Sequence, residues 1–214
     1  MRRAPLLLVA AACAAPEPAP GLPEGTGKGL LRADATPAEV ETCAAPVWKP
    51  GDRFVWRRGG AHKVATRVGS AGPDGYELVD EESKIVLRYT KELGELGQRR
   101  DGIAEATIEM APADLRYHWP LFVGKRWEVE VLLKVPGQAP RALRLEYHVE
   151  AKEALEVPAG RFVCYRICRR SRAAGNARGL EIVAFHWYAP EVGHFVRRLE
   201  NNVMLELERV ERAN

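Results

Sequence analysis

Apolar and polar side chains alternate along two stretches in the second half of the chain. Residues 126–131 place Trp127 and two valines on one side and charged residues on the other, and residues 143–150 repeat the pattern. A period of two is typical of a β-strand with one buried and one solvated face. Residues 136–140, Pro-Gly-Gln-Ala-Pro, lie between the two stretches and predict a turn that joins them as a hairpin.

Further short strands are predicted where apolar runs are bounded by Gly, Pro and Asn. Asn201-Asn202 fits a two-residue hairpin turn, because Asn tolerates positive φ. About ten strands without interleaved helical stretches favour an all-β fold, an antiparallel curved sheet arranged as a sandwich or a partly open barrel. The predicted strands are residues 53–58, 61–68, 76–80, 85–91, 126–131, 143–150, 162–169, 180–188, 194–200 and 203–207.

One short N-terminal helix is also expected. Thr36-Pro37-Ala38-Glu39 has the pattern of a capping box with Pro at the first helical position, which predicts a helix over 37–44 that ends before Pro46. The chain has 214 residues, 46% of them apolar, which is enough for one sizeable core. We therefore expect residues 47–212 to form a single antiparallel β domain.

The first twelve residues have the pattern of a secretory signal peptide, with Arg2 and Arg3 before a short apolar run. Ala10-Ala11-Ala12-Cys13 resembles a bacterial lipoprotein box, which predicts acylation of Cys13. Ordinary signal-peptidase cleavage is the alternative and would give a secreted protein. Residues 13–46 would then comprise the lipid attachment, a flexible Pro- and Gly-rich tether and the short helix. The expected location is the periplasmic face of a membrane, preferentially the outer membrane, with the lipid as membrane partner.

The charge argues against nucleic acid as a partner. The whole chain carries a formal net charge of +3, and removal of residues 1–12 leaves 30 basic against 29 acidic residues, or +1. Nucleic-acid binding needs a clustered basic face, and the charges here are mixed along the chain.

Three cysteines remain if Cys13 is acylated. Cys164 and Cys168 lie on one face of a predicted strand about 13 Å apart, too far for a mutual disulfide or a shared zinc ion. In an oxidising compartment, Cys43 is expected to pair with Cys164 or Cys168, and three buried thiols are the alternative.

No set of residues has the spacing of a catalytic, metal or cofactor site. The five histidines form no metal-ligand motif, and His186 is expected to be a core residue. The carboxylates of Glu128 and Glu130 are expected on a solvated strand face. Trp119 and Phe122, on either side of Pro120, are candidates for the mouth of a pocket. We therefore expect a protein that is not an enzyme and has no metal or cofactor.

Three short motifs occur in succession: Pro120 to Trp127 (PLFVGKRW), Val157 to Phe162 (VPAGRF) and Trp187 to Gly193 (WYAPEVG). Together they resemble the bacterial envelope proteins grouped as domain of unknown function 3108. The resemblance covers residues 47–210 and departs from the usual pattern at Glu191 and His194. It implies a curved antiparallel sheet similar to the half-barrels of lipoprotein carriers, and it supplies no catalytic residues.

The sequence therefore predicts an envelope domain that binds an apolar ligand, or another envelope protein, on the concave side of its sheet. A structural or assembly component without a ligand pocket is the alternative. An envelope hydrolase is less favoured, because no nucleophile, base or metal cluster is recognisable.

Overall fold

The computed structural model describes residues 27–175 and 180–213, and every regular element in them is a β-strand. None of these residues belongs to a helix with the length and apolar character needed to span a membrane. The strands are β1 (Gly29–Ala33), β2 (Arg53–Arg58), β3 (His62–Gly72), β4 (Gly75–Asp80), β5 (Ile85–Tyr89), β6 (Glu95–Arg100), β7 (Ala106–Asp114), β8 (Arg126–Lys134), β9 (Arg141–Val157), β10 (Gly160–Ala173), β11 (Ile182–Ala189), β12 (His194–Glu200) and β13 (Val203–Glu211).

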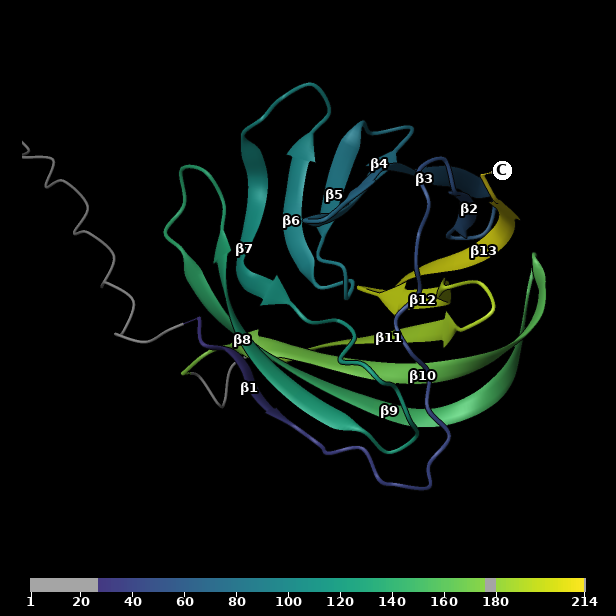
Figure 1. The fold of residues 1–214 in the computed structure, drawn as a ribbon. Coiled ribbons are helices and arrows are strands. Elements are labelled where there is room, and N and C mark those ends of the chain that lie inside the picture. The colour runs from purple at the N-terminus through teal and green to yellow at the C-terminus, as the bar shows by residue number, and fades with distance from the viewer. Residues whose placement is uncertain (1–26, 176–179, 214) are drawn as a thin grey trace, which may run out of the picture.

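Strands β2 to β13 form a closed antiparallel barrel in which each strand pairs with its neighbours in the chain (Figure 1). The circle closes where β13 pairs with β2. Of β8, only the last residues, from Leu132 to Lys134, pair with β7. Residues 127–130 of β8 pair with β1 instead. The expectation of a sandwich or a partly open barrel was therefore wrong, although the all-β antiparallel class is correct.

The predicted helix over 37–44 is also wrong, since this segment is not helical. Cys43 and Leu121 instead exchange two backbone hydrogen bonds, of 2.9 and 2.8 Å, as an isolated antiparallel bridge. A helix of eight residues is marginal without tertiary contacts, whatever its capping signal. Pairing with the segment before β8 and burial of the nearby Trp48 outweigh the local preference.

The connections before β2 and before β8 cover one end of the barrel, which we call the closed end. Trp48 is buried there and donates a hydrogen bond of 2.8 Å from Nε1 to the carbonyl oxygen of Gly193. Its ring is stacked on that of His194 at 5.1 Å. From the other connection, the ring of Tyr117 lies 5.2 Å from that of Tyr188 on β11.

Candidate functional site

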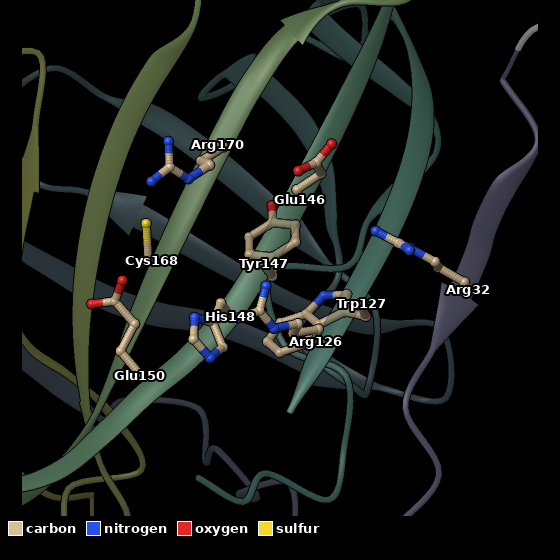
Figure 2. Close-up of a pocket in the computed structure, with 9 residues that line it drawn as sticks. All are labelled: Arg32, Arg126, Trp127, Glu146, Tyr147, His148, Glu150, Cys168 and Arg170. Atoms are coloured by element: carbon tan, nitrogen blue, oxygen red, sulfur yellow. The ribbon is translucent and has the colours of Figure 1, made fainter. Parts of the chain in front are cut away.

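A groove on the outer wall, of about 190 Å³, lies where β1 approaches β8, β9 and β10 (Figure 2). Arg126 and His148 are among its lining residues. Two of the groove's arginines are engaged in ion pairs: Arg32 with Glu128 at 3.0 Å, and Arg170 with Glu181 at 2.7 Å. Much of the charge in the groove is thus already neutralised by these ion pairs. We interpret the groove as the junction that holds β1 on the barrel.

Glu128 at this junction corrects a prediction. Its side chain is only 2% exposed and pairs with Arg32 and with Arg144. It faces outward, as the alternation in 126–131 predicted, but β1 lies beside it and removes it from solvent. The expectation of a solvated carboxylate failed because the sequence did not reveal β1.

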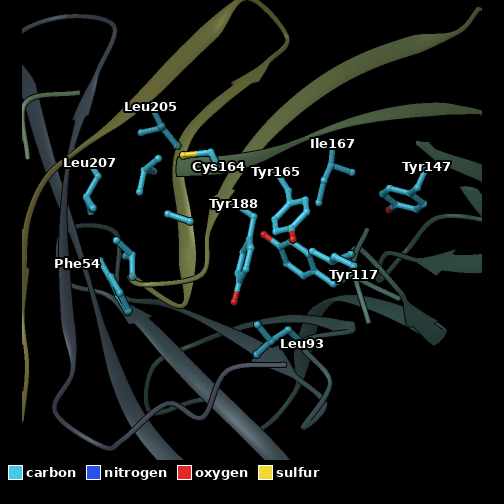
Figure 3. Close-up of a cluster of buried hydrophobic side chains, with 14 of the residues drawn as sticks. Phe54, Leu93, Tyr117, Tyr147, Cys164, Tyr165, Ile167, Tyr188, Leu205 and Leu207 are labelled. Carbon is cyan, nitrogen blue, oxygen red and sulfur yellow. The ribbon is translucent and has the colours of Figure 1, made fainter. Parts of the chain in front are cut away.

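The interior at the closed end is filled by aromatic and aliphatic side chains. Figure 3 shows Tyr117, Tyr165 and Tyr188 gathered between the walls, with Tyr147 farther along the interior. The rings of Trp127 and Tyr147 are stacked at 4.9 Å, so neighbouring strands are also tied by aromatic contact. Full burial of each such side chain contributes about 1.5–3 kcal/mol to stability.

A set of charged residues follows this apolar region on the inner face. Tyr147, Arg169, Ala184 and Glu200 oppose one another in succession across β9, β10, β11 and β12. Directly opposed residues of antiparallel strands point to the same face, and Ala184 is fully buried. Arg169 and Glu200 therefore point into the barrel.

Asp114 connects these side chains to the opposite wall. Its side chain has no exposed surface, and its Oδ1 accepts a hydrogen bond of 2.5 Å from the Tyr147 hydroxyl. The same hydroxyl accepts a bond of 3.2 Å from Nε of Arg169. Arg116 pairs with Glu95 and lies 3.7 Å from Asp114. We call Glu95, Asp114, Arg116, Tyr147, Arg169, Arg198 and Glu200 the interior charge network.

Burial and the neighbouring guanidinium groups set the ionisation in this network. Burial raises the pKa of Glu95 despite the attraction of Arg116. Burial would also raise the pKa of Glu200, but the arginines around it lower that pKa on balance. Burial, reinforced by the three arginines of the network, holds the pKa of His186 well below its ordinary value, so this core histidine is neutral at pH 7.

Among the arginines of the network, Arg198 has the fewest of its hydrogen-bond donors engaged. Its Nε lies 3.9 Å from Glu200, at the limit of an ion pair, and its side chain keeps 28% of its surface exposed. Within residues 27–175 and 180–213 its guanidinium makes no hydrogen bond to a protein group, although it lies 5.3 Å from the ring of Phe195. A guanidinium has five N–H donors, so Arg198 can receive a further acceptor.

The barrel end opposite the closed end has inward-facing apolar side chains that are only half-buried. Met110 opposes Leu133, and Leu143 opposes the buried Val131, which places all of them on the inner face. Leu87 opposes the buried Leu78 and continues the ring on the other wall. We call this ring the apolar mouth; its members are Ile85, Leu87, Ile108, Met110, Leu133 and Leu143, each of intermediate burial.

The mouth and the network together offer accessible apolar surface above a charged floor. Such a surface can bind a molecule with an apolar body without any covalent chemistry. Among the described residues, no group of three or more His, Cys, Asp or Glu side chains could hold a metal ion.

The residues proposed as a pocket mouth lie at the closed end. Trp119 donates a hydrogen bond of 2.8 Å to the carbonyl oxygen of Glu92, and its ring is 5.3 Å from that of Tyr188. Phe122 is buried, with the ammonium of Lys125 5.4 Å from its ring centre. The structure thus places both in packing contacts, and a role for them in ligand binding stays a prediction.

The three described cysteines are free thiols in separate surroundings. Cys43 lies near Lys152 and Tyr188, Cys164 near Glu153 and Glu191, and Cys168 near Glu150 and Arg170. A disulfide of Cys43 with Cys164 or Cys168 stays a prediction, tested by mass mapping of non-reduced peptides. The predicted lipid attachment at Cys13 lies outside the described residues.

The interior charge network was not recognised from the sequence. A signal was nevertheless available, since Arg169 follows Tyr165 and Ile167 at the same spacing of two and therefore shares their inward face. Arg116 and Asp114 carry no comparable signal, because they lie where β7 ends and an irregular connection begins.

No family model matches the chain, and no curated protein sequence matches it. Among solved structures, the chain is similar to the hypothetical lipoprotein YmcC from Escherichia coli K12, with a TM-score of 0.51 and 10% identity over 79% of this chain and 90% of that one. A candidate lipoprotein from Parabacteroides distasonis gives a TM-score of 0.43 at 13% identity, covering 79% of this chain and 99% of that one. A candidate exported protein from Bacteroides fragilis with a YmcC-like fold gives 0.42 at 17% identity, covering 80% and 100%.

The likeness to YmcC concerns the fold. It supports an all-β architecture shared with a hypothetical lipoprotein and leaves the resemblance to domain of unknown function 3108 a prediction.

Proposed function

We propose that the chain is an exported, lipid-anchored envelope protein whose barrel binds an apolar ligand at the apolar mouth without catalysing a reaction. The signal-peptide pattern and the lipoprotein box of the sequence support this location, and YmcC, which shares the fold, is described as a hypothetical lipoprotein. The binding role is supported by the inner face of the barrel.

The observation that carries the proposal is the incomplete burial of the apolar mouth. Inward-facing apolar side chains of a filled barrel would be removed from water, and each square ångström left accessible forgoes about 25 cal/mol of stabilisation. Six such residues retain accessible surface at one end, while Phe54, Val129 and Leu145 on the same inner face are fully buried. Accessible apolar side chains gathered on an inner face are typical of a binding site.

The entry point of the N-terminal segment supports the same role. The backbone nitrogen of Gly27 donates a hydrogen bond of 3.0 Å to Glu130, and its Cα lies next to Leu132 and Ala111. Leu132 belongs to the half of β8 near the mouth, and Ala111 of β7 pairs with it. The fourteen residue steps from Cys13 to Gly27 can span at most about 50 Å, so a lipid on Cys13 would keep this side of the barrel within that distance of the membrane surface.

The test is a fluorescence titration with the methyl ester of cis-parinaric acid, an uncharged polyene chain. The protein is the full chain with Cys13→Ser, which removes the acylation site. We expect saturable binding that Ile108→Glu weakens at least about tenfold, because a carboxylate in the mouth must be desolvated when the chain binds.

Thr107→Glu is the matched control, because Thr107 is the exposed, outward-facing neighbour of Ile108 on β7. Circular dichroism of each variant confirms that the barrel is folded. Absence of saturable binding, or equal affinity in Ile108→Glu and the unmodified mouth, would overturn the proposal.

The second candidate is an assembly component that binds another envelope protein. It is favoured by exposed apolar side chains at the start of β11, where Leu180, Ile182 and Val183 are 86%, 40% and 38% exposed. This candidate predicts no saturable binding of the ester, so the same titration separates the two.

A further inference from the structure

We infer that the ligand is an amphiphile with an anionic head, which Arg198 receives at the floor of the apolar mouth while the hydrocarbon chain lies against the ring of apolar residues. This inference rests on the proposed function and adds the chemical class of the ligand. A carboxylate and a phosphate monoester share the recognised chemistry.

The first support is the unused hydrogen-bonding capacity of Arg198. Within 4 Å its one described acidic partner is Glu200, at 3.9 Å, and 28% of its side chain is exposed inside a wall whose neighbours Val196 and Ala184 are fully buried. A guanidinium binds a carboxylate or phosphate through two parallel N–H donors, which requires two adjacent free donors such as those of Arg198.

The second support is the position of Arg198 relative to the mouth. It opposes His186 on β11 and Leu205 on β13, two buried inward-facing residues. Glu200, two residues farther along β12, is the last residue of that strand before the turn at the mouth end. Arg198 therefore lies one step deeper than the rim, where the head of an inserted chain would come to rest.

The third support is the charge that surrounds the site. Three arginines, Arg116, Arg169 and Arg198, face three acidic residues, Glu95, Asp114 and Glu200, on the inner walls. The raised pKa of Glu95 lowers the negative charge that this residue contributes. Asp114 is engaged by Tyr147 and Arg169, and Glu200 accepts a hydrogen bond of 3.3 Å from Arg169. The remaining donors of Arg198 thus favour an anion over a cation.

A buried donor in the same region strengthens this preference. Nε of Arg116 is buried and makes no hydrogen bond within the described residues, although its charge is paired with Glu95. An anion near the network would gain attraction from this second guanidinium in a medium of low polarity.

The experiment compares cis-parinaric acid with its methyl ester at pH 8, in the full chain with Cys13→Ser. Both probes have the same hydrocarbon chain, but only the acid is anionic. We expect the acid to bind at least about tenfold more tightly, as a charge-assisted pair of hydrogen bonds would provide. Arg198→Met should abolish that preference, and Arg198→Lys should retain part of it.

Arg197→Met is the matched control. Arg197 is the next residue on β12, faces the outer wall and pairs with Glu206 there. We expect it to leave both affinities unchanged, since its side chain does not reach the interior.

The outcomes separate this inference from the proposed function. Equal binding of acid and ester, each weakened at least about tenfold by Ile108→Glu, would overturn the anionic head group and leave the proposed apolar site in place. Binding of neither probe would remove the proposed function itself. Stronger displacement of the ester by dodecyltrimethylammonium than by dodecanoate or dodecyl phosphate would also overturn the inference, and the better competitor of the two anions would identify the head group.

Discussion

Asp114 has no exposed surface and lies among Tyr147, Arg116 and Arg169, so one carboxylate joins β7 to β9 and β10 across the interior. The transfer of a charge from water into protein is unfavourable unless partners compensate it. Here two guanidinium groups and a hydroxyl do so. The network need not increase net stability over an apolar core of the same volume, but the loss of one member leaves the others uncompensated.

We predict that Asp114→Asn lowers the free energy of unfolding by about 3–5 kcal/mol, because Arg116 and Arg169 would remain buried without this counter-charge. Urea unfolding followed by tryptophan fluorescence measures the change. Glu109→Gln is the control, since Glu109 and its partner Lys134 are 47% and 44% exposed, and its effect should stay below about 1 kcal/mol. A small effect of Asp114→Asn would mean that the network does not hold the walls together.

His194 predicts a loss of stability in mild acid. Burial, chiefly, lowers its pKa to about 3 in the fold, so between the ordinary value of 6.5 and that value the unfolded chain binds the proton more readily. Stability contributed by the neutral ring is therefore present above pH 6.5 and is lost as pH falls, by about 2 kcal/mol from pH 7 to 5. His186 acts in the same direction, and Glu95, whose pKa is raised, acts in the opposite one.

His194→Phe isolates this contribution, because a phenyl ring can keep the stacking on Trp48 without titrating. We expect the difference in unfolding free energy between pH 7 and pH 5 to shrink by about 2 kcal/mol. His62→Gln, at a side chain that is 54% exposed, should leave the difference unchanged. An unaltered pH dependence in His194→Phe would contradict the prediction.

At the scale of elements, alternation was a reliable guide where it was uninterrupted. Residues 53–58 and 194–200 were predicted with the bounds of β2 and β12, and the hairpin of β8 and β9 was confirmed together with its turn. β6 and β7 were missed. Gly97 within β6 and Pro112 within β7 break the alternation of side chains, and the register between these two strands shifts at two points.

The errors near the N-terminus have a tertiary cause. β1 is five residues long and exists because residues 127–130 of β8 offer an unpaired edge where β7 diverges. The capping signal at Thr36 is local, and it was overridden by the bridge between Cys43 and Leu121. No pattern within a short window of sequence records either event, and the same is true of closure between β13 and β2.

The hairpin between β12 and β13 allows a direct test of its turn. Asn201 and Asn202 have φ of 50° and 60°, the left-handed conformation that the sequence predicted for this pair. Asn201→Ala should lower the free energy of unfolding by about 1 kcal/mol, because alanine is disfavoured in that region. Asn202→Gly should not lower it, since glycine adopts positive φ without steric cost. Equal losses in the two variants, measured by urea unfolding, would contradict this account.

At the scale of the whole molecule, the two barrel ends differ in composition and in covering. Trp48, Tyr117 and Trp119 cover the closed end, whereas the apolar mouth retains accessible surface. Closure of the sheet removes the two open edges that the sequence-based prediction of a curved sheet left unexplained. The same closure turns the expected concave side into an interior, whose apolar side chains keep accessible surface at the mouth end.

This asymmetry predicts an orientation on the membrane if Cys13 carries a lipid. The acylated protein should partition into the detergent phase, and Cys13→Ser should move it to the aqueous phase, because two acyl chains are needed for a stable anchor. A fluorescent amino acid at Ile103, exposed in the turn between β6 and β7 at the mouth end, should then be quenched by brominated lipids more strongly than one at Val47, exposed at the closed end. Equal quenching would show that the mouth does not face the bilayer, and quenching that persists in Cys13→Ser would show that a surface of the barrel, rather than the lipid, holds the protein there.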